Sequence, residues 1–350
     1  MGRARSCFRN GIPDCGWWIV ARYWGIWTRE KLQILERYLT AFNIAAKRSK
    51  ERIYLDLFAG VPVNLDRKTG EEISGSPRIA LSMTNPPFTR LHFFELPGNA
   101  RKLEDALRAQ YPDRGLVVHP GDCNEAIVDA LKDLAPLRWA PTFAFIDPAG
   151  PDFRWQTLVR LADHRRREKT KVELWLLLPV DLFVRTLPVE GGVQVRPEDA
   201  AKITEMYGTD DWKHIYAARL RNDISAGDAR EEYVNLMRYR LEVLLGYRWT
   251  HPFEVLNEGG RPIYHMIFAT DHEAGTKIMT AIYNKAAQEF PAMRRRAGQL
   301  RKEKSLQEKT GSKWLFGEEE MAVLLPDRDR YVDEYRYEAP WRPTWKKDGD

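Results

Sequence analysis

Five short apolar runs alternate with segments of helical periodicity along the first half of the chain, and no other feature limits the fold as strongly. The runs lie at 52–58, 91–95, 116–118, 142–146 and 172–178. Between them, apolar residues recur at three- and four-residue spacing. Consecutive strands that are joined by helices pair in parallel through right-handed crossovers, so we predict an α/β fold built on a parallel sheet.

The second half of the chain begins with helical patterns and closes the sheet differently. Residues 198–245 predict helices, and the runs 249–256 and 263–270, with a turn between them, predict a β-hairpin. A helix is expected over 272–288. A parallel sheet closed by a C-terminal antiparallel hairpin resembles the Rossmann-like class I methyltransferase fold, in which the helical segment at 185–247 is an insertion.

This arrangement divides the chain into three parts. An irregular N-terminal arm at 1–27, rich in Gly, Arg and Trp, precedes the Rossmann-like domain at 28–290, and a charged extension occupies 291–350. Thr28 predicts the N-cap of a helix that continues to residue 47. Residues 61–75 carry turn and charged residues without apolar periodicity and are expected to form a loop. 

Bulk composition excludes several classes of protein. No apolar run approaches the ~18 residues of a membrane span, and no signal peptide is visible, so we expect a cytoplasmic protein without membrane contact. The three cysteines form no CxxC pattern and the seven histidines are widely spaced, so we predict no metal site. The net charge of +5 is concentrated in two basic segments, 1–50 and 293–313. Such segments can follow phosphates, although a charge run is more often a solvated face.

Four predicted strands end in an acidic residue, namely Asp56, Glu95, Asp122 and Asp147. Ligands of an open parallel sheet bind at the carboxyl ends of its strands, where an acid after the second strand can bind a ribose diol. Asp122 would then accept the exocyclic amine of an adenine. A single acid of this kind is more often a helix cap or a turn former, but four in succession favour a nucleoside cofactor. The GxGxxG fingerprint of dinucleotide sites is absent.

Several motifs together resemble the three-Cys-motif partner family (TcmP). They are Trp27-Thr28 with Lys31-Leu32, Tyr54-Leu55-Asp56-Leu57-Phe58-Ala59-Gly60, Gly75-Ser76-Pro77, Phe93-Phe94-Glu95, Gly121-Asp122 and Phe145-Ile146-Asp147-Pro148-Ala149-Gly150. The resemblance spans 11–290 and implies a bacterial or phage-associated protein with a methyltransferase-like fold, S-adenosylmethionine as cofactor and a separate Cys-rich partner protein. The expected cofactor-binding residues are Asp56, Phe58, Ala59, Gly60, Glu95 and Asp122.

Two segments depart from the related motifs. Asp147-Pro148 is similar to the start of the motif with which amino-methyltransferases of nucleic-acid bases orient an exocyclic amine, but Ala149-Gly150 lacks its second proline and its stacking aromatic. Phe153 or Trp155 could stack instead. In the first motif, Val61-Pro62 stands where the family has Pro-Gly. Losing that glycine removes a position of easy positive φ, which predicts weaker cofactor binding or a different path of the loop.

The sequence therefore favours an S-adenosylmethionine-dependent methyltransferase that acts on an amine of a nucleic-acid base, with Asp147 and Pro148 as its catalytic residues. Two alternatives stay open. The first is a non-catalytic or cofactor-sensing partner module for a Cys-rich protein in a phage-related or defence system. The second is a metal-dependent nucleic-acid processing enzyme that uses the acidic strand ends as ligands.

Overall fold

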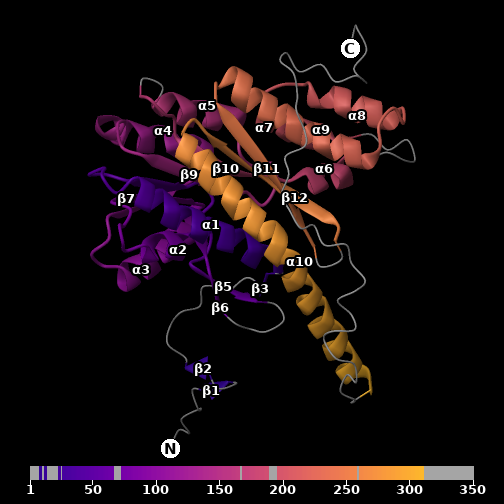
Figure 1. Ribbon diagram of the computed structural model, residues 1–350, viewed down its shortest axis with the longest axis horizontal. Helices are drawn as coiled ribbons and strands as arrows, with labels where there is room; N and C mark the ends of the chain where they lie inside the picture. Colours follow the sequence, from indigo (N-terminus) through magenta and orange to yellow (C-terminus); the bar gives the residue numbers. More distant parts are fainter. Residues whose placement is uncertain are drawn as a thin grey trace, which may run out of the picture.

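The computed structural model describes residues 8–9, 12–13, 23–24, 26–66, 72–165, 168–188, 195–257 and 260–310. Its centre is a seven-stranded sheet (Figure 1). From one edge to the other, the strands are β11 (Trp249–Leu256), β12 (Pro262–Thr270), β10 (Glu173–Leu178), β9 (Thr142–Ile146), β4 (Ile53–Asp56), β7 (Arg90–Glu95) and β8 (Leu116–Pro120). The five strands from β10 to β8 are parallel, and β12 runs antiparallel to both of its neighbours. This order is that of the Rossmann-like class I methyltransferase fold, so the predicted fold class is confirmed.

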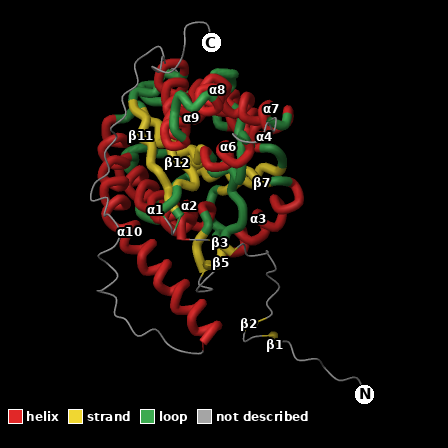
Figure 2. Tube along the Cα trace, turned by 90° about the vertical axis from the view of Figure 1, so that its right-hand side faces the viewer, coloured by secondary structure: helices red, strands yellow, loops and turns green. Residues whose placement is uncertain are grey.

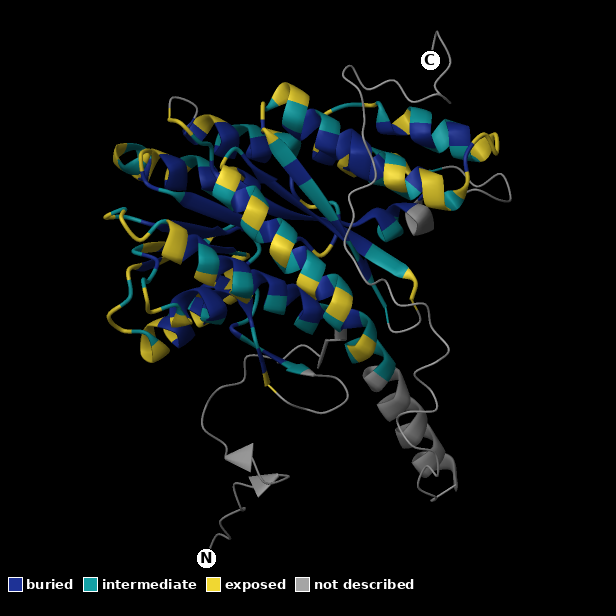
Figure 3. Ribbon diagram, viewed as in Figure 1, coloured by how far each residue is buried: buried dark blue, intermediate teal, exposed yellow. Residues whose placement is uncertain are grey.

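The central strands are buried on both faces because helices cover both sides of the sheet (Figure 3). Side chains alternate along each strand, so that Phe143 and Phe145 of β9 enter one core and Ala144 and Ile146 enter the other. This double burial explains why the strands read in sequence as continuous apolar runs rather than as an alternating pattern.

One face of the sheet carries the helices α1 (Ile26–Ala45), α2 (Ser76–Ser82), α3 (Pro97–Gln110) and α10 (Glu273–Thr310) (Figures 1 and 2). The α1 helix uses an apolar stripe for this contact, in which Leu35 and Leu39 are fully buried. Tyr38, on the same stripe, packs against Phe143 with ring centroids 5.3 Å apart. The start of α1 is thereby fixed close to the carboxyl ends of the strands.

The other face carries the remaining helices, which are α4 (Cys123–Asp133), α5 (Trp155–His164), α6 (Val180–Thr186), α7 (Pro197–Tyr207), α8 (Trp212–Leu220) and α9 (Ala226–Tyr239). The last four lie between β10 and β11 in the chain, where the sequence predicted helices. Ser225 begins α9 with a capping box, in which its hydroxyl accepts the Asp228 amide and the Asp228 carboxylate accepts the Ser225 amide. The helix ends in a π-helical turn, Arg240–Leu244.

The segment 61–75, expected to be a loop, instead contains two short strands. β5 (Val63–Asp66) and β6 (Glu72–Ser74) pair antiparallel, and β5 also pairs in parallel with β3 (Tyr23–Trp24). The prediction was wrong because each strand has only three or four residues with polar positions among them, which is too short for a periodic signal.

Two helix ends also differ from the expectation. The first helix begins at Ile26, so Thr28 lies inside it rather than at its N-cap. The last helix does not stop at 288 but continues through Pro291 to Thr310. Pro291 removes one backbone donor, yet Phe290 before it is fully buried against Phe253 of β11 and Met293 after it packs against the same core, so packing continues past the proline.

The two ends of the chain carry expectations that stay largely untested. In the predicted N-terminal arm, β1 (Phe8–Arg9) and β2 (Ile12–Pro13) pair antiparallel, and most of the arm lies outside the described residues. The same holds for 311–350 of the predicted extension. Among the helices of the described part, none combines the length and the hydrophobicity that crossing a bilayer requires.

Candidate functional site

The loop after β4 is closed by backbone hydrogen bonds onto the neighbouring strand β7. The Ala59 amide donates to the Phe94 carbonyl (3.0 Å), and the Gly60 amide donates to Oε2 of Glu95 (2.8 Å). Gly60 makes the turn with a φ of 62°, a conformation that favours glycine. The structure thus brings together the predicted residues of the first motif and the acid at the end of the second parallel strand.

The segment Val61-Pro62 follows the first motif without backbone strain. Positive φ is required only at Gly60, and the chain then continues directly into β5. The Gly75 amide donates to the Pro62 carbonyl (2.9 Å), and a Cβ at Gly75 would lie 2.3 Å from the Val61 carbonyl oxygen. The glycine of the next motif therefore accommodates the replaced segment by close backbone approach.

Asp56 is the most perturbed acid at this edge of the sheet. It is fully buried, and its Oδ1 has no hydrogen-bond partner. Burial raises the pKa of Asp56 from 3.8 to about 7; the hydroxyls of Ser76 and Tyr54 oppose this rise, and the charge of Asp147 adds to it. A buried carboxyl with an unpartnered oxygen and a pKa near neutrality is more typical of a functional site than of a core.

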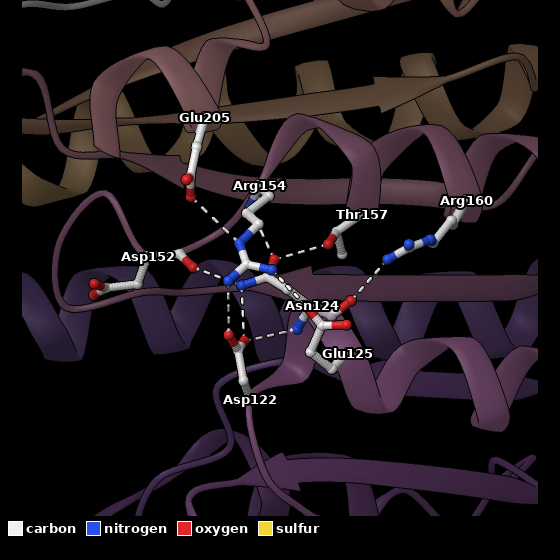
Figure 4. A network of polar contacts seen from close by, with 8 residues as sticks. All are labelled: Asp122, Asn124, Glu125, Asp152, Arg154, Thr157, Arg160 and Glu205. Carbon is white, nitrogen blue, oxygen red and sulfur yellow. Dashed lines mark hydrogen bonds and ion pairs between the residues drawn. The ribbon is translucent and has the colours of Figure 1, made fainter. Parts of the chain in front are cut away.

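Asp122 follows β8 and caps the next helix (Figure 4). Its Oδ1 accepts the amide of Asn124 (2.9 Å) and the side-chain nitrogen of the same residue (2.8 Å). The Gly121 amide donates to the Glu95 carbonyl (3.0 Å), so this turn is tied to the end of β7. Asp122 is therefore both the structural cap that such acids usually are and a neighbour of Glu95, with its Oδ2 on the exposed side.

Asn124 locks this turn to the loop that follows β9. The residue is 2% exposed, and both hydrogen-bonding groups of its amide are saturated. The nitrogen donates to Asp122 and to the Asp152 carbonyl, while the oxygen accepts the Arg154 amide (2.8 Å) and the Thr157 hydroxyl (2.7 Å). Since all four bonds are made, the amide holds the two loops in a single arrangement.

Arg154 lies among three acids from different elements (Figure 4). Its guanidinium pairs with Glu125 of α4 (2.5 Å), with Asp122 (3.5 Å) and with Glu205 of α7 (3.4 Å). The residue thereby joins the end of β8 to the helical block of the other layer. Its side chain is 42% exposed, so each pair is a solvated one of modest strength.

Asp147 and Pro148, the predicted catalytic residues, follow β9 directly. Pro148 is buried. Asp147 forms an ion pair with Lys31 of α1, with Nζ and Oδ2 2.5 Å apart, and both side chains are largely covered. The carboxylate that would orient an acceptor amine is thus already bound to an amine of the chain itself.

Neither aromatic residue suggested to replace the missing stacking partner lies free to do so. Phe153 is fully buried in the core beneath α4 and α5. Trp155 packs under the guanidinium of Arg240 at 4.4 Å from its ring centroid. A Cβ at Gly208 would lie 2.5 Å from two ring atoms of Trp155, so the indole is also packed tightly against this glycine. Both are structural residues.

The residues that sequence analysis missed are Lys31 as the partner of Asp147, and Asn124 and Arg154 as the partners of Asp122. Each is distant in sequence from the acid it contacts or lacks a distinguishing pattern. Within the described ranges, no group of three His, Cys, Asp or Glu residues could hold a metal ion, so the metal-dependent alternative finds no ligand set there. Burial raises the pKa of Cys123 to about 12, so this thiol is protonated and unreactive.

Similarity to known proteins is found among solved structures. No family model matches the chain, and no curated protein matches its sequence. Among solved structures, protein LPL1258 from Legionella pneumophila, described with the family DUF519, is 14% identical with a TM-score of 0.43, over 74% of this chain and 91% of its own. The methyltransferase domain of bacterial CtHen1 is 9% identical with a TM-score of 0.30, over 67% of this chain and 99% of its own. The assignment of a methyltransferase-like fold therefore rests on the strand order of this chain.

Proposed function

We propose that this chain binds S-adenosylmethionine at the carboxyl ends of β4, β7 and β8 and transfers a methyl group to an amine, with a nucleic-acid base as the acceptor. The observation that carries the proposal is the hydrogen bond from the Gly60 amide to the Glu95 carboxylate. It joins the close backbone approach of the first loop to the acid of the second strand, the combination with which Rossmann-like sheets bind a nucleoside.

The residues present fit an adenosyl group. Each oxygen of Glu95 accepts one backbone amide, from Gly60 and from Leu96, and each retains a second lone pair for a ribose hydroxyl. Oδ2 of Asp122, whose side chain is 44% exposed, can accept an adenine amine, since the pair that it forms with Arg154 is a long one of 3.5 Å. The unpartnered Oδ1 of Asp56 supplies a further polar group beside the first loop, where Phe58 and Ala59 continue the lining.

The acceptor side of the proposal rests on Asp147 and Pro148. Bound S-adenosylmethionine would supply an electrophilic methyl group, and Asp147 would accept an N–H of the acceptor amine and so hold it in place. The basic segment 293–313 favours a nucleic-acid acceptor, although within it Arg294 is already paired with Glu30 of α1. Membership of the three-Cys-motif partner family, with a Cys-rich protein as partner, forms part of the same proposal.

Calorimetric titration tests the cofactor first. S-adenosylmethionine and S-adenosylhomocysteine should both bind the unmutated protein. Glu95→Ala should weaken binding by about 10- to 100-fold, because hydrogen bonds to a charged group contribute about 1.5–3 kcal/mol. Glu104→Ala removes an exposed acid of α3 and is the matched control, with no expected change. Absence of binding by the unmutated protein would reject the proposal.

A second measurement, which does not depend on the calorimetric titration, identifies the acceptor. Transfer of labelled methyl groups from the cofactor is followed separately into RNA, DNA and protein. Label in a nucleic-acid fraction, lost in Asp147→Ala, supports the amine-directed reaction. Label in protein alone contradicts the nucleic-acid acceptor while leaving the cofactor site intact.

One observation favours a second function, a cofactor-sensing partner module. Asp147 is occupied by Lys31, and of the two aromatic residues suggested for stacking, Phe153 is fully buried and Trp155 is covered by Arg240. A module of this kind would bind S-adenosylmethionine and a Cys-rich partner protein without turnover. Cofactor binding together with no methyl transfer to RNA, DNA or protein would support it over the enzyme.

A further inference from the structure

Lys31 is the one described basic side chain that contacts a predicted catalytic residue. It extends from the second turn of α1 to Asp147, and its side chain is only 9% exposed. Its ammonium also lies 5.7 Å from the ring centroid of Tyr264 on β12. An ammonium that donates to a carboxylate and stacks beside an aromatic ring makes the same two contacts that an amino-bearing base would seek there.

The segment that carries Lys31 is held by polar contacts that are long or incompletely satisfied. The Tyr264 hydroxyl donates to the Trp27 carbonyl at 3.4 Å, a long bond. Glu30 is fully buried against Arg294 of α10, and its Oε2 has no hydrogen-bond partner. A buried carboxylate that is half satisfied opposes its own burial, so the first turns of α1 are less strongly anchored than the turns around Leu35 and Leu39.

We propose that Lys31 occupies the acceptor subsite, where its ammonium takes the place at Asp147 that belongs to the acceptor amine, and that acceptor binding requires its displacement. This inference rests on the proposed function, because it assigns the acceptor side of that same site. It makes Lys31 a positioning residue, which keeps Asp147 in place and covers it until an amine competes for the carboxylate.

A second pair in the protein provides a matched control. Lys171 pairs with Asp271 at 2.9 Å and lies 5.4 Å from the ring centroid of Tyr247, so it repeats the lysine–aspartate–tyrosine arrangement. It precedes β10 and therefore stands at the opposite end of the strands. A purely structural role for such pairs predicts that Lys31→Met and Lys171→Met behave alike.

The experiment compares two nucleosides that differ only in the exocyclic amine, adenosine and purine riboside. Each is titrated into the unmutated protein, Lys31→Met, Lys31→Arg and Lys171→Met, all saturated with S-adenosylhomocysteine. Adenosine should bind Lys31→Met about tenfold more tightly than the unmutated protein, a gain of about 1.4 kcal/mol. Purine riboside should bind Lys31→Met no more tightly than the unmutated protein. Adenosine should bind Lys31→Arg and Lys171→Met as it binds the unmutated protein, since Lys31→Arg keeps a donor at Asp147 and Lys171→Met leaves Lys31 in place.

Lys31→Met could fail to fold, so a measurement on the unmutated protein accompanies it. Acetylation of Lys31 by an amine-reactive ester, followed by peptide mass spectrometry, should accelerate with adenosine and not with purine riboside, while Lys171 stays unchanged. Equal gains for both nucleosides, or no amine-dependent change at Lys31, would overturn the inference. Failure of S-adenosylhomocysteine to bind rejects the proposed function alone, because the nucleoside comparison in the cofactor-free protein still decides the role of Lys31.

Discussion

At the scale of single residues, the acids of the candidate site serve structure and ligand binding together. Oδ1 of Asp122 caps α4, and both oxygens of Glu95 accept backbone amides. A carboxylate has about four acceptor positions, so one backbone bond per oxygen leaves room for a ligand. The structural and functional interpretations of a strand-end acid therefore do not exclude each other. The backbone bonds fix the carboxylates before any ligand arrives.

Asp56 should make stability depend on pH in the direction opposite to a surface acid. Its folded pKa of about 7 lies above the ordinary value of 3.8, so the unfolded chain loses this proton at lower pH. Stability is therefore highest below pH 3.8 for this group and falls as pH rises to 7. The free energy of unfolding in urea should therefore rise in Asp56→Asn relative to the unmutated protein across this pH range. The total difference should be about 4 kcal/mol, at 1.36 kcal/mol per pKa unit. Exposed Asp129→Asn should not gain, and an equal gain there would contradict the assignment.

Gly75 should be irreplaceable for the altered first loop. A methyl group in Gly75→Ala would lie 2.3 Å from the Val61 carbonyl oxygen, so the backbone of one segment must move. We expect a loss of about 1–3 kcal/mol in urea unfolding and weaker binding of S-adenosylhomocysteine. Gly98→Ala is the control, because no atom lies within 4 Å of the added carbon. Equal stability of the two variants would show that the backbone around Val61 accommodates the added methyl group without cost.

At the scale of elements, the strands of the seven-stranded sheet were predictable, and the contacts that helices make with distant segments were not. β9 and β11 coincide with their predicted ranges because unbroken burial or a regular hairpin leaves a local signal. The continuation of α10 past residue 288 was missed because Pro291 is a stop signal in sequence, whereas the packing of Phe290 against Phe253 and of Met293 against the core supports the helix on both sides of the proline. Similarly, Lys31 and Asp147 are 116 residues apart, and no local pattern pairs them.

The contact between α1 and α10 should depend on pH through one buried pair. Arg294 holds Glu30, and burial raises the pKa of Glu30 to about 7 in spite of that partner. At pH 8, Arg294→Met strands a buried carboxylate and should cost about 3 kcal/mol in urea unfolding. At pH 5.5 the folded protein already holds Glu30 protonated, so the cost should shrink. Lys277→Met, which breaks an exposed pair with Glu273, should cost under about 0.5 kcal/mol at both pH values.

At the scale of the whole molecule, the candidate site lies where both helical layers reach the same edge of the sheet. α1 of one layer contributes Lys31 to Asp147, and α7 of the other contributes Glu205 to Arg154 and so reaches Asp122. The sequence could place the four acids at this edge because strand ends of a parallel sheet converge. The sequence could not show that a side chain from each helical layer contacts these acids or their partners, since the pairs Lys31–Asp147 and Arg154–Glu205 are formed only by tertiary packing.

Arg154 should therefore carry the effect of cofactor binding into the helical block. When an adenine amine binds Asp122, the guanidinium loses one of its three partners and should move toward Glu125 and Glu205. Hydrogen exchange should show S-adenosylhomocysteine protecting α7 as well as the turn after β8. Arg154→Met should keep protection of the turn and lose that of α7, at a stability loss below about 1 kcal/mol because its pairs are exposed.

The control for this coupling is Arg196→Met, which removes pairs with Glu198 and Asp199 inside α7 and touches no strand end. It should leave the cofactor-dependent protection of α7 in place. Unchanged protection in Arg154→Met would mean that the helical block responds to the cofactor through the packed core or not at all. Loss of this protection in both variants would mean that it depends on the stability of α7 itself. Only loss confined to Arg154→Met assigns the coupling to the guanidinium, because the two variants differ in whether a charge at the strand edge is removed.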